Sequence, residues 1–253
     1  MQPKNVFDQF QRFLHETSGD FHILEQKVPV EIQMEYFRFS DRLRKEPDYL
    51  KNVDYDLYAT DLQNQDSPFE YKRHILSTLA ISKQVKAYRI LEEYAQAPSP
   101  ELTNWAYMAL MESRITLESE LSDEKQIYIS TGLGGKGHKL RFFVLLLAAK
   151  GNPFLEYQQQ VIEREFAYAL SKVDAEIDRL TIREKHVELV MLIPIQQDIK
   201  QLLEAIIKEC NQYGHFISNN FTITNVRELD EKEIAKIIKS HETDMSVNPH
   251  LRG

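Results

Sequence analysis

A pattern of two strands and a helix, which occurs twice in the second half of the chain, constrains the fold more than any other feature. Its first copy begins with alternating apolar residues in Gln126–Thr131, continues with the apolar run Lys139–Leu147 and ends with an amphipathic helix from Pro153 to about Val173. Alternation predicts a half-buried strand, whereas a continuous apolar run of this length predicts a strand buried on both faces.

The second copy follows about 47 residues later. A strand over 177–182 precedes the apolar strand Val187–Ile193, and a helix with one apolar side follows over 199–210. A last strand at Phe221–Val226 and a short helix from Asp230 to Ile238 complete the set. We therefore predict an α+β fold whose mixed sheet carries helices mostly on one face.

The first half is predicted to be helical. Apolar residues recur at helical intervals from Val6 to about Lys45, and further helices are expected over Pro68–Ile81, Lys83–Gln96 and Pro100–Ser113. The stretch Glu46–Asp66 is rich in Asp and Tyr and poor in periodicity, so it is interpreted as a linker or an exposed acidic loop.

Two short motifs in this half carry a family resemblance. They are Ser99-Pro100-Glu101-Leu102 followed by Ala106, Ala109 and Leu110, and Val85-Lys86-Ala87 followed by Ile90-Leu91. Over Ser67–Leu117, about a fifth of the chain, these motifs resemble the first and second helices of a HEAT-type helical repeat. The resemblance implies a scaffold that binds other proteins.

Two domains and a tail are expected from these patterns. Residues 1–123 would form a helical domain with the acidic loop 46–66, residues 124–240 an α/β domain, and residues 241–253 a flexible tail. A chain of 253 residues with a 42% hydrophobic and a 28% charged fraction can bury one large core or two smaller ones.

The composition also bears on where the chain works. The longest apolar run has the length of a strand and not of a membrane helix, and the first residues show no secretory signal. The single cysteine, Cys210, excludes an internal disulfide and a zinc site built from cysteines. We therefore expect a cytoplasmic protein that does not enter a membrane.

Charge is unevenly distributed along the chain. Residues 1–123 contain 14 Lys+Arg and 21 Asp+Glu, giving −7, whereas residues 124–253 contain 17 and 18, giving −1. An acidic surface repels the phosphates of nucleic acids. We therefore expect the first half to stay away from nucleic acid, and we do not expect DNA as a partner.

One loop between two predicted strands has an unusual composition. It holds four of the eight glycines within six positions, and no acid occurs from Ile127 to Lys150. Glycines can turn backbone N–H groups towards an anion, and lysines add positive charge, so the loop predicts a phosphate site. The residues of this site would be Gly132, Gly134, Gly135, Lys136, Gly137, His138, Lys139 and Arg141.

A structural explanation of the same loop stays open. The loop does not fit G-x-x-x-x-G-K-[ST], and a strand follows it where a P-loop requires a helix. In a hairpin tip the glycines would serve turn geometry, and the basic residues would keep a strand end soluble. Both the phosphate site and the plain turn are therefore hypotheses.

Other candidates have simpler explanations. Cys210 continues an apolar stripe, which predicts a buried structural cysteine. The histidines form no ligand pattern such as H-E-x-x-H, and His241-Glu242-Thr243-Asp244 lies in the predicted tail, where ligands would lack supporting groups. We therefore expect no metal, no cofactor and no catalytic residue.

Three functions are compatible with these patterns. The leading hypothesis is a non-enzymatic interaction or adaptor protein with a protein partner, because no acid–base or nucleophile set is recognised. The alternative is a phosphate-recognising protein that binds a nucleotide or RNA at the loop 132–139. A third hypothesis is an enzyme whose site lies between the two halves and uses this loop as a lid.

Overall fold

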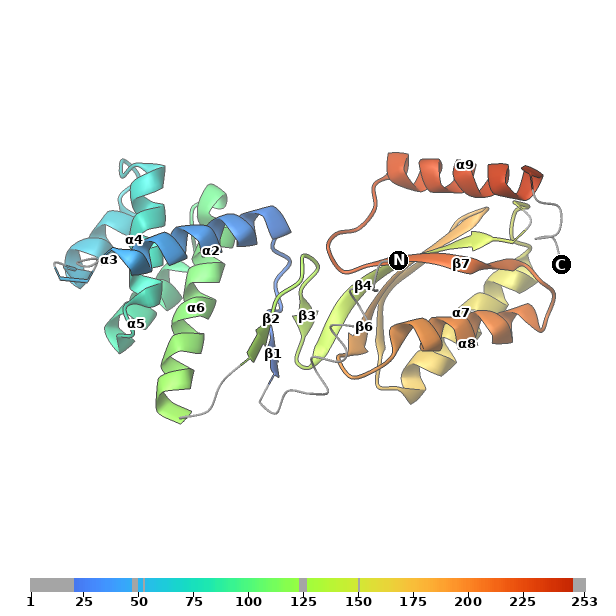
Figure 1. Cartoon of the computed structure of the whole chain (residues 1–253), viewed down its shortest axis with the longest axis horizontal. Coiled ribbons are helices and arrows are strands. Elements are labelled where there is room, and N and C mark those ends of the chain that lie inside the picture. Colours follow the sequence, from blue (N-terminus) through green and yellow to red (C-terminus); the bar gives the residue numbers. More distant parts are fainter. Residues whose placement is uncertain (1–20, 47–49, 52, 123–126, 150, 248–253) are drawn as a thin grey trace. The chain divides into compact units, whose positions relative to one another are not determined.

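The computed structural model describes residues 21–46, 50–51, 53–122, 127–149 and 151–247. The chain forms two compact units (Figure 1). The helical unit comprises residues 21–24 and 28–129, and the sheet unit comprises residues 25–27 and 130–247. The division falls a few residues after the predicted one, because β2 (Ile127–Ile129) pairs in parallel with β1 (Phe21–Ile23). Of the helical pattern predicted from Val6 to about Lys45, the part up to residue 20 lies outside the described residues, and the last part forms a helix over Val30–Lys45.

The helical unit contains the three helices predicted after residue 67. Its elements are α2 (Val30–Lys45), α3 (Tyr55–Gln63), α4 (Phe69–Ile81), α5 (Val85–Tyr94), the short 3-10 helix η1 (Pro100–Leu102) and α6 (Thr103–Ser122). The loop predicted over 46–66 is wrong where α3 forms. Asp54 caps this helix, because its carboxylate accepts hydrogen bonds from the backbone of Asp56 and Leu57. The HEAT-type resemblance stays a prediction.

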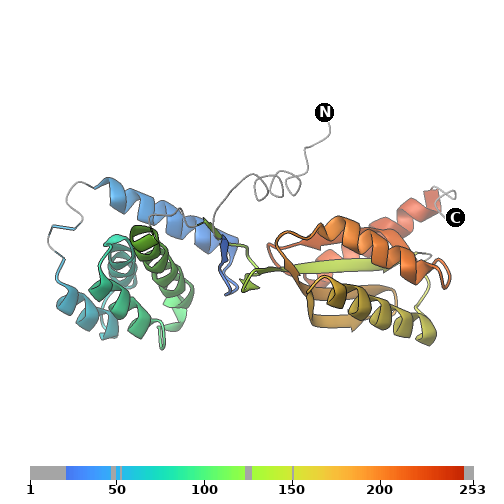
Figure 2. The same cartoon turned by 90° about the horizontal axis from the view of Figure 1, so that it is seen from below.

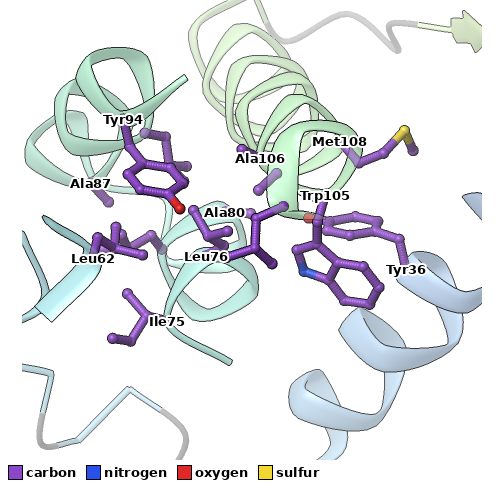
Figure 3. Packing of buried hydrophobic residues seen from close by; sticks show 14 of the residues in the cluster. Tyr36, Leu62, Ile75, Leu76, Ala80, Ala87, Tyr94, Trp105, Ala106 and Met108 are labelled. Atoms are coloured by element: carbon purple, nitrogen blue, oxygen red, sulfur yellow. The ribbon is translucent and has the colours of Figure 1, made fainter. Parts of the chain in front are cut away.

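Trp105 lies in the core of this unit, as its position in an apolar stripe indicates (Figure 3). Its ring packs edge-on against Tyr36 at 5.1 Å, and its Nε1 donates a hydrogen bond to Ser77 Oγ at 3.0 Å. The guanidinium of Arg73 lies 3.6 Å from the centre of the same ring. These contacts give the polar atoms of a buried aromatic residue their partners.

A buried carboxylate completes the packing of this unit. Glu112 accepts hydrogen bonds from Tyr36 Oη at 2.5 Å and from Ser40 Oγ at 2.9 Å, and it forms an ion pair with Arg44. Burial raises the pKa of the Tyr36 phenol well above its usual range, and the nearby Glu112 carboxylate raises it further. Because Glu112 belongs to α6 and its three partners belong to α2, this network holds the two helices together.

The sheet unit confirms the predicted α+β class. Its elements are β3 (Gly135–Lys136), β4 (Lys139–Ala148), α7 (Glu156–Lys172), β5 (Glu176–Ile182), β6 (His186–Pro194), α8 (Ile199–Asn211), β7 (Ile217–Thr224) and α9 (Glu231–Val247). β4 pairs with β6 and with β7, and β5 lies outside β6. From β4 to β7 the order is β-α-β-β-α-β, the ferredoxin-like arrangement.

Two predictions about this sheet are wrong. The sheet is antiparallel throughout its described pairs and not mixed. The unit that occurs twice is strand, helix, strand: β4-α7-β5 is followed by β6-α8-β7. The alternating segment counted as the first strand is β2, which pairs in the helical unit.

Helices cover both faces of the sheet (Figures 1 and 2). α7 and α8 pack together on one face, whereas α9 covers the other. Phe143, Leu145 and Leu147 of β4 share a buried cluster with Ile234 of α9.

The prediction of a flexible tail from residue 241 is wrong up to Val247, because residues 241–247 continue α9. Residues 248–253 lie outside the described part. Within the described residues, no helix has the length and hydropathy needed to cross a membrane.

Candidate functional site

The predicted phosphate loop packs closely against other parts of the sheet unit. A Cβ atom at Gly132 would lie 1.8 Å from the carbonyl oxygen of Val226, and one at Gly134 would lie 2.2 Å from that of Glu25. Gly137 has φ +57° and occupies the two-residue turn between β3 and β4. Close packing and turn geometry therefore require three of the four glycines.

The positive charges of this loop have carboxylate partners. Lys136 Nζ and Lys139 Nζ each lie 2.8 Å from an oxygen of Glu176, and Lys139 Nζ also lies 3.0 Å from Asp174 Oδ1. The hydrogen bonds from Lys136 and then Lys139 lower the pKa of the Glu176 carboxyl to about 2. His138 is exposed at the turn.

Two backbone N–H groups of the loop also have partners in the same chain. Gly135 N donates to Glu25 O at 3.2 Å, and Gly137 N donates to the Glu25 carboxylate at 2.9 Å. Arg141 forms an ion pair with Asp178 on β5. The structure thus brings the residues predicted to bind phosphate close together, but their charges are paired with carboxylates of the same chain. It therefore favours the structural explanation of the loop over the phosphate site.

A second basic surface, which the sequence patterns did not bring out, lies on α9. Lys232, Lys236 and Lys239 are spaced by four and three residues, so they share one side of the helix, opposite the side on which Ile234 and Ile238 pack against the sheet. All three lysines are exposed, and none forms an ion pair with any described residue. We call these residues the lysine stripe.

The acids of α9 whose side chains the structure describes do not neutralise the lysine stripe. Glu233 pairs with Arg227, whose hydrogen bonds lower the pKa of the Glu233 carboxyl to about 2. Glu242 pairs with Lys185 at 3.1 Å. Glu231 precedes the stripe by one position, and residues one apart on a helix do not face each other. The stripe therefore presents three like charges to solvent.

An ionisable pair lies beneath α9. His186 and Glu188 of β6 stand opposite Leu147 and Leu145, which face α9, so both polar side chains point to that same face. His186 Nε2 lies 3.4 Å from Glu188 Oε1, and Arg183 Nε lies 3.4 Å from the same oxygen. The sequence signal for this pair is two ionisable residues at alternate positions of an otherwise apolar strand, and no sequence-based prediction used it.

His241 of α9 has a buried imidazole nitrogen. It lies on α9, next to the Glu242 that pairs with Lys185, and its Nε2 is buried without a hydrogen-bond partner among the described residues. The described residues hold no group of three or more His, Cys, Asp or Glu side chains placed to bind a metal.

Cys210 is buried in α8, where burial raises the pKa of its thiol to about 12, as expected for a structural cysteine.

A cleft of about 610 Å³ opens at the end of the sheet where β4 finishes. The loop before α7, the first turn of α7 and the loop before β7 form its walls. Most of its wall is apolar, with a few amide and imidazole groups. Its lining residues are Ala148, Asn152, Pro153, Phe154, Leu155, Gln158, Gly214, His215 and Phe216.

Comparison with known proteins finds solved structures that are similar to part of this chain, among them two transposases. No protein-family model matches the chain, and no curated protein matches it. One similar structure, named a "putative transposase" from Deinococcus radiodurans R1, has 12% identity, covers 43% of this chain and 93% of its own, and gives a TM-score of 0.35. The other, a REP-associated tyrosine transposase bound to a REP hairpin, has 12% identity, covers 42% and 67%, and gives a TM-score of 0.31.

These neighbours run against the functional predictions. Both are named as transposases, and one is bound to a REP hairpin. The prediction of a non-enzymatic, protein-binding adaptor is therefore corrected. The exclusion of DNA as a partner is corrected with it, because one neighbour is bound to a REP hairpin. At 12% identity and TM-scores of 0.35 and 0.31, the likeness assigns no activity to this chain.

Proposed function

We propose that the sheet unit binds a nucleic-acid strand through the phosphates that contact the lysine stripe of α9. The observation that carries the proposal is the placement of charge. Lys232, Lys236 and Lys239 are exposed on one side of α9 without a carboxylate partner among the described residues, whereas Lys136 and Lys139 are paired. Unpaired lysines can neutralise phosphates and release their counterions.

The spacing of the lysines suits a phosphate backbone. An α-helix rises about 1.5 Å per residue, so Lys232 and Lys239 are separated by about 10.5 Å along the axis of α9. One strand of a duplex carries a phosphate about every 3.4 Å along its axis. About three phosphates of a strand with duplex-like spacing therefore pass the stripe, one for each lysine.

The net charge of the chain does not oppose this contact. The excess of acids, −7, belongs to residues 1–123, whereas residues 124–253 carry −1. Exposed charges are screened over about 8 Å at physiological ionic strength, so the local lysines dominate the potential at α9. A lipid surface fits less well, because the apolar side of α9 packs on the sheet and cannot enter a bilayer.

Binding of labelled single-stranded DNA, followed by fluorescence anisotropy across a salt series, tests the proposal. The variant Lys232→Ala/Lys236→Ala/Lys239→Ala should lose at least about tenfold in affinity. Its slope of log K against log salt should be shallower by about 2, from about 0.7 per lost phosphate contact.

A charge-matched control separates the stripe from net charge. The variant Lys172→Ala/Lys200→Ala/Lys208→Ala removes three exposed lysines from α7 and α8, on the other face of the sheet. It should bind as the unchanged protein does. If both variants lose affinity equally, net charge alone explains the binding, and the stripe has no special role. If neither variant loses affinity, the proposal is rejected.

A further inference from the structure

The cleft at the end of β4 combines apolar walls with polar groups that have no partner. Phe154 and Phe216 meet edge to face at 6.3 Å, and Leu155 is 57% exposed beside them. The side chains of Asn152 and His215 are exposed and make no hydrogen bond with any described residue. The walls are therefore suited to a ligand with apolar faces and a polar edge.

A nucleobase has this chemistry. Its flat faces stack on apolar and aromatic side chains, and its edges take hydrogen bonds from amide and imidazole groups. The volume of about 610 Å³ falls in the range of small-ligand sites, about 300–1,000 Å³. A sugar or an inorganic phosphate would leave the apolar walls without a partner. A lipid chain would leave Asn152 and His215 without one.

The cleft is connected to the end of the lysine stripe. Phe154 N donates to Glu184 O at 2.7 Å, and Ala148 N donates to Lys185 O at 2.9 Å. Lys185 in turn pairs with Glu242 of α9 at 3.1 Å. Residues 184 and 185 thus join the cleft wall to the last turns of α9, at the same end of the sheet.

We propose that this cleft accepts one unstacked base of a single strand whose phosphates lie along the lysine stripe. The inference rests on the proposed function for the path of the strand, but the cleft itself recognises the base without its phosphate. Adenosine and cytidine should therefore bind the unchanged protein, and the stripe variant should bind them equally well.

The test uses two probes and a pair of matched substitutions. Leu155→Trp places a larger side chain in the cleft from an exposed position, and Val85→Trp makes a similar change on α5, where Val85 is 64% exposed. Titration of each nucleoside by NMR should show binding to the Val85→Trp variant and a loss of at least about fivefold in the Leu155→Trp variant. Asn152→Ala, which removes one edge contact, should weaken binding by about two- to fivefold.

The second probe reports the base within a strand. A single-stranded oligonucleotide with one 2-aminopurine should change its fluorescence on binding, because the base leaves its neighbours, and Leu155→Trp should remove that change while anisotropy still reports binding. Lost anisotropy in the stripe variant with retained nucleoside binding would support both proposals. No nucleoside binding, together with a 2-aminopurine signal that Leu155→Trp leaves unchanged, would overturn the cleft proposal alone.

Discussion

The sheet unit has two lysine-containing surfaces, and their lysines differ in whether they have carboxylate partners. In the glycine loop, Lys136 and Lys139 contact the Glu176 carboxylate at 2.8 Å. On α9, the three lysines of the stripe have no carboxylate partner among the described residues. The more conspicuous sequence therefore forms the neutralised surface, and the inconspicuous one carries the free charge.

This difference has an electrostatic reason. A lysine whose ammonium group already hydrogen-bonds a carboxylate must exchange that partner for a phosphate, so little free energy is left for binding. A lysine surrounded by water and other lysines gains the full benefit of counterion release. A local excess of lysines in the sequence is thus a poor measure of the potential at the surface.

The largest effect should come from the glycines that allow the loop to pack. Gly132→Val places a Cβ atom 1.8 Å from the carbonyl oxygen of Val226, so the backbone must move, at a cost of more than about 3 kcal/mol. Gly137→Ala enters open space at φ +57° and should cost about 1–2 kcal/mol. Urea unfolding measures both. Equal stability of the two variants would contradict the packing explanation of the loop.

Charge reversal should separate the two surfaces by their binding. Lys236→Glu, in the middle of the stripe, should weaken the binding of single-stranded DNA by about tenfold, or about 1.4 kcal/mol. Lys136→Glu makes the same change in the glycine loop and should leave DNA binding within about twofold. Anisotropy titrations at one salt concentration compare them. The comparison between the surfaces fails if Lys136→Glu is the more harmful of the two.

The pairing in the loop should be visible in the pH dependence of stability. The folded pKa of Glu176 is about 2, below its ordinary value of 4.5, so the stability due to this carboxylate is present above pH 4.5 and is lost as the pH falls towards 2. The difference in melting temperature between the unchanged protein and Glu176→Gln should shrink in that window. A constant difference from neutral pH down to pH 2 would show that the Glu176 charge is not responsible.

The smallest effect concerns the stability of α9 itself. Lys232 and Lys236 are like charges four residues apart, which destabilises a helix by about 0.2–0.5 kcal/mol. Lys232→Glu removes this repulsion and places a negative charge in the first turn, where the helix dipole favours it. Thermal unfolding should therefore show a slightly more stable protein that binds DNA less well. Lower stability in this variant would show that the stripe has a packing role instead.

Much of the local structure was predictable from the sequence. The apolar runs became β4 and β6, the periodic segments became α4, α5, α7 and α8, and the stripe through Cys210 placed this residue in the core. The acidic segment with α3 was less predictable. There, the weak periodicity predicts a loop, but the capping hydrogen bonds of Asp54 stabilise a helix.

The sequence by itself determined which segments form strands and helices, because the period of apolar residues and the end signals act within a few positions. Only the tertiary structure decided which charges are free. Glu176 lies 37 positions from Lys139, and Glu25 lies 112 positions from Gly137, yet both close the glycine loop. Ion pairs form between groups that the fold brings within about 4 Å. The sheet joins β5 and residues 25–26 to the loop, whereas the outer side of α9 faces no other described segment of the sheet unit.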